Sequence, residues 1–109
     1  MVNQNTWKNS VEIVGRVSSA GEQLELPSGE TLTKFRVVVP REKPVTKTTI
    51  DTINCTVFKE SVQKKALKLE VDQVVELTGQ LRRRFWQTGT GTASHMEIEV
   101  QSLKTLRSA

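Results

Sequence analysis

Apolar and polar residues alternate along much of this chain, and a period of two is typical of half-buried β-strands. The first alternating segment covers residues 11–18, with a weaker continuation at Leu24 and Leu26. The second covers residues 32–39. The third, residues 50–58, is rich in β-branched side chains, which favour strands. The pattern therefore predicts three consecutive strands.

The periodicity changes in residues 60–69, where Val62 is the only β-branched residue. Val62, Ala66 and Leu69 recur at helical spacing, so one face of this segment is apolar. Ser61 can cap the first turn. We therefore expect one short helix after the third strand.

Alternation returns in residues 74–86 and again at Met96, Ile98 and Val100, which predicts two further strands. The intervening residues 87–94 contain two glycines and three threonines and are predicted to form a flexible hairpin loop. The residues of the fourth strand expected to face inward are Val75, Leu77 and Leu81.

Three strands, one helix and two more strands follow the order of the oligonucleotide-binding fold. We therefore predict an all-β domain with one short helix, a five-stranded Greek-key barrel covering residues 9–106. Residues 1–8 are expected to be a polar leader and residues 107–109 a short end. Gly15 and Gly79 lie inside strands, where glycine often marks a bulge or a tight bend. Strict βαβ alternation is absent, which argues against a parallel doubly wound sheet.

The composition indicates one mildly basic domain. The chain has 109 residues and a net charge of +4, which permits an acidic partner. Its one cysteine, Cys55, has no disulfide partner and no metal-site spacing, so no cofactor is expected and a reducing compartment fits. The polar start lacks the apolar run of a signal peptide, and no segment approaches the roughly 20 apolar residues that span a bilayer. These features predict a cytoplasmic protein without a membrane partner.

Residues with catalytic chemistry are scattered. The single histidine, His95, lies on a polar strand face, and Asp51 and Asp72 are isolated in the sequence. Residues 89–91 are too short for a phosphate-binding loop, and no predicted helix follows them. We therefore do not expect an enzyme.

Residues 79–86 combine cations with an aromatic ring. Arg82, Arg84 and Trp86 share one strand face because side chains alternate. Guanidinium groups beside an indole suit a ligand that carries both phosphates and flat rings, as single-stranded nucleic acid does. The structural alternative is that Trp86 packs on the end of the barrel. The opposite face carries Leu81, Arg83 and Phe85.

The third strand also has two different faces. Ile53, Cys55 and Val57 form the predicted core side. The other side is polar apart from one aromatic ring, which can be a base platform or the edge of the core. Its residues are Thr52, Asn54, Thr56 and Phe58.

Cations also concentrate in and after the second strand, where the polar connection 40–48 begins. They either line a phosphate groove or form an ordinary solvated face. These residues are Lys34, Arg36, Arg41, Lys43 and Lys47. The helix lysines Lys64, Lys65 and Lys68 are interpreted as ordinary surface, and the role of Trp7 stays open.

The chain resembles the bacterial single-stranded DNA-binding proteins over roughly residues 9–104. The resemblance rests on residues 9–17, 35–39, 54–59 and 75–86, and its most specific part is the Gly-Gln-Leu-Arg…Trp run that begins at Gly79. It implies a five-stranded barrel that binds single-stranded DNA with little sequence preference. It also implies dimers or tetramers, and a bacterial, nucleoid-associated location.

Two residues match stacking positions of that family, Trp86 and Phe58. Thr52 falls where the family usually has a tryptophan, and residues 41–44 lack the aromatic that is common there. We therefore expect weaker binding and greater reliance on charge. In the family the first strand pairs across a two-fold axis, a role that Val14 and its neighbours can fill.

The family also has an acidic carboxy-terminal tail that recruits partner proteins, whereas residues 103–109 are basic. Replication or repair proteins remain conceivable partners, but without that tail to recruit them. The expected function is binding and protection of single-stranded DNA in replication, repair or recombination. The alternatives are a primosomal or other protein-interaction barrel with weak nucleic-acid binding, and an enzyme on the same barrel.

Overall fold

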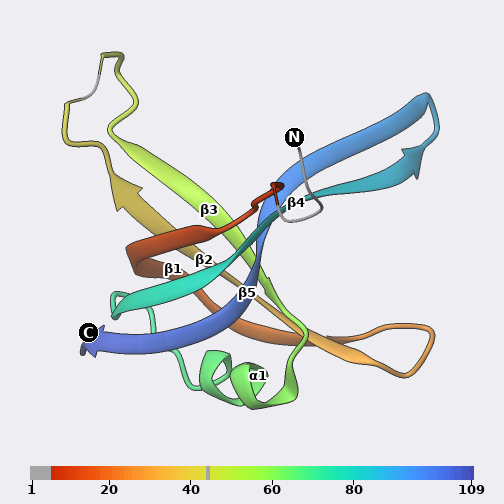
Figure 1. The fold of residues 1–109 in the computed structure, drawn as a ribbon, viewed down its shortest axis with the longest axis horizontal. Coiled ribbons are helices and arrows are strands. Elements are labelled where there is room, and N and C mark those ends of the chain that lie inside the picture. The colour runs from red at the N-terminus through yellow and green to blue at the C-terminus, as the bar shows by residue number, and fades with distance from the viewer. Residues whose placement is uncertain (1–5, 44) are drawn as a thin grey trace.

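The computed structural model describes residues 6–43 and 45–109. Residues 1–5 of the predicted leader and Pro44 of the connection lie outside the described residues. The elements are β1 (Val11–Glu25), β2 (Thr31–Pro40), β3 (Ile50–Val57), α1 (Glu60–Ala66), β4 (Val74–Thr88) and β5 (Gly91–Arg107). The strands close into a barrel in the order β1-β2-β3-β5-β4, with α1 at one end (Figure 1). This architecture confirms the predicted fold.

The barrel closes through one parallel contact. β3 pairs with β5 in parallel, with Cys55 opposite Ile98, while the other neighbouring strands pair antiparallel. The alternating apolar residues of all five strands meet inside, and α1 adds Val62 and Ala66. The core therefore follows the period-two and helical patterns of the sequence.

The β4–β5 pair is longer than expected. β4 continues to Thr88 and β5 starts at Gly91, so the prediction of a flexible loop over residues 87–94 is wrong. The pair extends away from the barrel as an arm (Figure 1). Threonine favours strands, and the glycine-rich composition concealed this pairing. Leu81 lies where the arm leaves the barrel and is exposed, whereas Val75 and Leu77 are buried as expected.

The helix begins differently from the prediction. Its N-cap is Lys59 and no side chain caps it, so Ser61 does not have the predicted role. The buried side chain of Gln63 instead ties α1 to the barrel. Its amide nitrogen donates to the Phe58 carbonyl oxygen at 2.9 Å, and its amide oxygen accepts from Thr33 at 2.9 Å.

Glycine occurs at the two strand positions, Gly79 and Gly15, for different structural reasons. A register shift lies between Thr78 and Gly79, which confirms the expected bulge there. Gly15 lies in regular pairing with Val75, and a Cβ there would approach the Val38 carbonyl oxygen to 3.0 Å. Close approach, rather than a bulge, therefore favours glycine at this position.

Cys55 provides a test of the core. Burial, with the Glu97 charge as a smaller cause, raises the pKa of the Cys55 thiol to about 12. We expect iodoacetamide at pH 8 to modify Cys55 slowly in the folded protein and rapidly in urea, measured by intact mass. An unfolded thiol titrates near ~8.5. The Cys55 thiol of the unfolded chain therefore loses its proton at a lower pH than the thiol of the folded protein. As a result, the free energy of unfolding should fall as the pH rises from about 8.5 to 12. Equal modification rates in both states would contradict a buried Cys55.

Candidate nucleic-acid interface

One outer face of the barrel collects side chains from four neighbouring strands. β2 contributes Lys34 and Arg36, and β3 contributes Asn54 at the position paired with Arg36. β5 and β4 continue this face, with Glu97 paired opposite Arg82. Lys34, Arg36, Asn54 and Arg82 therefore lie on one face.

Trp86 lies on the outer part of this face, on the β4–β5 arm. It is 46% exposed, and its ring contacts that of His95, with centroids 5.2 Å apart and planes tilted by 54°. At this exposure the Trp86 ring is not sealed in the hydrophobic core.

Phe58 is half-buried just after β3. The guanidinium carbon of Arg84 lies 5.4 Å from the centre of its ring, within cation–π distance. The Gln63 side chain donates a hydrogen bond to the backbone carbonyl of Phe58. The two candidate stacking rings, Phe58 and Trp86, are thus placed by different elements on the same surface.

The arginines of β4 have acidic partners that sequence reasoning missed. Arg82 Nε lies 2.6 Å from Glu99 Oε2, and Arg84 Nε lies 2.6 Å from Glu97 Oε1. The signal was available, because Glu97 and Glu99 alternate along the last strand. Their pairing partners depend on the register of β5 against β4.

Glu97 is the centre of a buried polar cluster. Its side chain is 5% exposed, and Thr56 donates a hydrogen bond to Oε2 while Arg84 pairs with Oε1. His95 Nε2 lies 3.8 Å from the same Oε1 atom. Thr56 is therefore buried, although its strand face suggested an open position. Its role is to hold the carboxylate that holds Arg84.

The β2 side of the face keeps its cations available. Arg36 Nε donates to Asn54 Oδ1 at 3.0 Å, and both side chains are exposed. Lys34 is exposed and has no ion-pair partner among residues 6–43 and 45–109. Both cations border a hollow of about 250 Å³ that reaches Glu97 and His95. Glu22, which stands opposite Lys34 in the β1–β2 ladder, also lines this hollow, so two carboxylates lie beside its cations.

The connection after β2 contributes less free charge than expected. Arg41 Nη2 lies 2.7 Å from Asp51 Oδ1, and this hydrogen-bonded pair lowers the pKa of the Asp51 carboxyl. Lys43 and Lys47 are exposed on the same connection, and Thr52 is exposed at the near end of β3. Within the described part of the chain, Arg41 pairs with Asp51, and none of Lys43, Lys47 and Thr52 makes a hydrogen bond, ion pair or ring contact with Trp86 or Phe58.

Residues 6–43 and 45–109 also bear on metal binding and membrane insertion. No group of three or more potential metal ligands was found among them. No helix among them is long and apolar enough to cross a membrane.

A closed five-stranded barrel with a short helix between β3 and β4 defines an oligonucleotide-binding fold, here with rings and cations on one outer face. The model of the Single-strand binding protein family matches residues 8–106, so the chain belongs to that family.

Among solved structures, the chain is similar to one described as Plasmodium falciparum SSB complex with ssDNA. The TM-score is 0.76 and the sequence identity 21%, and the alignment covers 96% of this chain and 99% of that chain. At this identity the similarity supports the fold. No curated protein matches the chain.

Proposed function

We propose that this protein binds and protects single-stranded DNA on the outer face of β2, β3, β5 and β4. The observation that carries the proposal is the exposed ring of Trp86, on the same surface as Phe58, Lys34 and Arg36. Bases stack on the rings, and phosphates pair with the cations. Sequence preference is slight, because every base has a π-face and phosphate contacts carry no sequence information. The protein acts without catalysis in replication, repair or recombination.

The ion pairs on this face limit its affinity for single-stranded DNA. Arg82 and Arg84 are each paired with a glutamate, so phosphate must compete with carboxylate for them. If Lys34 and Arg36 alone neutralise phosphates, log affinity falls with log salt at a slope near −1.4, at about 0.7 per charge. If the arginines also exchange partners, the slope approaches about −3.

Binding to labelled oligothymidylate and to a duplex of equal length tests this proposal directly. Fluorescence anisotropy should show tighter binding to the single strand, with solution mass recorded alongside. Equal affinity for both would overturn it. Such a result would favour the protein-interaction barrel, whose basic surface meets nucleic acid only through charge.

Self-association is part of the proposal. The pairing of β1 with β2 starts at Arg16, so residues 11–15 pair on one side only, with β4. Val14 lies in this segment and is exposed. We propose that a second copy adds along this edge, which gives a dimer and allows a tetramer.

Neutralising Glu99 should strengthen DNA binding. Glu99→Gln releases Arg82 and removes a negative charge from the face, so oligothymidylate affinity should rise about two- to fivefold, since an exposed ion pair is worth about 1 kcal/mol or less. The salt slope should steepen by about 0.7. Anisotropy titrations at several salt concentrations measure both.

The control is Glu25→Gln, which removes the same charge from an exposed position at the far end of β1. It should leave affinity and slope nearly unchanged. An equal gain in both variants would show that net charge, rather than release of Arg82, controls binding.

A further inference from the structure

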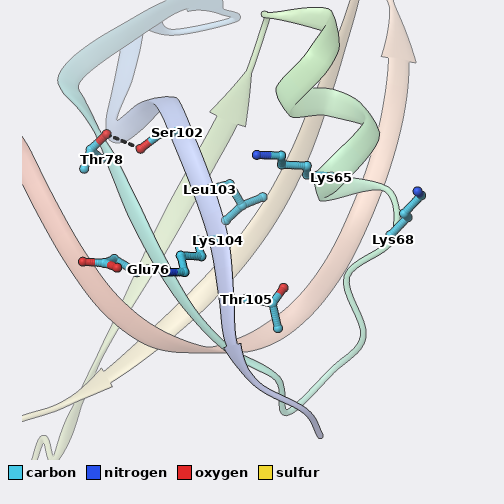
Figure 2. A pocket seen from close by; sticks show the side chains of 8 residues that line it. All are labelled: Lys65, Lys68, Glu76, Thr78, Ser102, Leu103, Lys104 and Thr105. Atoms are coloured by element: carbon cyan, nitrogen blue, oxygen red, sulfur yellow. Dashed lines mark hydrogen bonds between the residues drawn. The ribbon is translucent and has the colours of Figure 1, made fainter.

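A second hollow lies beside the proposed DNA face, between α1 and the last part of β5. It has a volume of about 710 Å³, and Lys65, Lys68 and Lys104 lie around it (Figure 2). Lys65 belongs to α1, Lys68 to the turn that follows, and Lys104 to β5. Elements far apart in the sequence therefore bring three cations to one place.

The helix cations of this hollow are available to a ligand. Lys65 and Lys68 are exposed, and neither has an ion-pair partner within the described part of the chain. Glu76 is the acidic side chain that lines the hollow, and it stands opposite Lys104 in the β4–β5 ladder. The charge of Lys104 is thus partly offset, and the uncompensated positive charge comes from Lys65 and Lys68.

The hollow lies further along the same two strands, β4 and β5, that contribute to the proposed DNA face. Thr78, Gln80 and Arg82 follow one another on the outer side of β4. Thr78 lines the lysine hollow and hydrogen-bonds to Ser102, its neighbour on β5, as Figure 2 shows. Gln80 and Arg82 line an intermediate hollow of about 460 Å³ that also contains Phe58. A chain that leaves Phe58 can follow this route to the lysines.

We propose that single-stranded DNA leaving the ring-bearing face continues along β4 and β5, and that its phosphates bind Lys65 and Lys68 in this hollow. The inference rests on the proposed function and extends its site to the helix end of the barrel. It also replaces the sequence-based interpretation of these lysines as ordinary surface. The lining is cationic, has hydroxyl groups and lacks exposed aromatic rings, so this part of the site contacts the backbone rather than the bases.

The test combines oligonucleotide length with charge removal. Oligothymidylates of about 5 and about 16 nucleotides, the range of sites on one such barrel, are titrated against the wild type and Lys65→Gln/Lys68→Gln. The short oligonucleotide should bind both proteins equally. For the long one, the variant's salt slope should be less steep by about 1.4, because each lost contact removes about 0.7.

Lys64→Gln is the matched control, since Lys64 belongs to the same helix but lines a different hollow. It should leave both slopes unchanged. An unchanged slope in the double variant would overturn the inference, and so would an equal loss for both oligonucleotides, which would show a general charge effect. Binding of a polyglutamate peptide at Lys65 and Lys68, with DNA slopes unchanged, would assign the hollow to an acidic protein instead. If neither oligonucleotide binds the wild type, the proposed function itself fails.

Discussion

Trp86→Ala should weaken binding of oligothymidylate about 5- to 150-fold. One stacked base contributes roughly 1–3 kcal/mol to the binding free energy by alanine substitution, and few other rings on this face can stack with bases. The indole is half exposed on the β4–β5 arm, so its removal leaves the core intact. Anisotropy of a labelled oligonucleotide is the appropriate measurement, because Trp7 would complicate intrinsic fluorescence.

Phe85→Ala is the matched control for this prediction. Phe85 precedes Trp86 on the same strand, points to the opposite face and is 67% exposed. Its removal should change affinity less than about twofold. Equal losses in both variants would place the DNA elsewhere on the arm, or show that the arm itself had been disrupted.

Gly79→Ala should destabilise the fold strongly. A Cβ at this position would lie well inside 3.0 Å of the Glu99 carbonyl oxygen, a distance that real Cβ atoms essentially never show. The contact is with backbone, so β4 and β5 must separate at the bulge. Overpacking typically costs about 1–3 kcal/mol, and the upper end is expected here. At about 4–8 °C per kcal/mol, a loss of about 3 kcal/mol should lower the Tm by about 12–24 °C in circular dichroism melting.

The same substitution at Gly89 separates this effect from the general properties of glycine. A Cβ at Gly89 meets no atom within 4 Å, and its backbone is not in the left-handed region. Gly89→Ala should therefore leave the Tm within a few degrees of the wild type. A similar fall in both variants would contradict the role of close packing at Gly79.

The prediction from sequence was most accurate where a residue's environment follows from local periodicity. Alternation placed Cys55, Val57 and Leu77 in the core, and the helical spacing of Val62 and Ala66 was also confirmed. It failed where the chain leaves the barrel. Leu81 keeps the core alternation and pairs with the buried Ile98, but it lies at the edge of the barrel, where the arm begins, and is 42% exposed.

The candidate site likewise has features that follow from local periodicity and features that do not. The shared face of Arg82, Arg84 and Trp86 follows from strand geometry alone. The pairing of the two arginines with Glu99 and Glu97 does not, because it depends on which β5 residues stand opposite them. The position of Lys65 and Lys68 beside Lys104 also depends on the tertiary structure, because α1 and β5 are far apart in the sequence.

The amino-acid sequence by itself determined the strand order, the apolar core and the side of β4 that carries Trp86, because these depend on the period of side-chain direction. Only the tertiary structure decided which charges are neutralised and which remain available. Ion pairing depends on distances of a few ångströms between strands, and the register shift between Thr78 and Gly79 sets which β5 residues stand opposite Arg82 and Arg84.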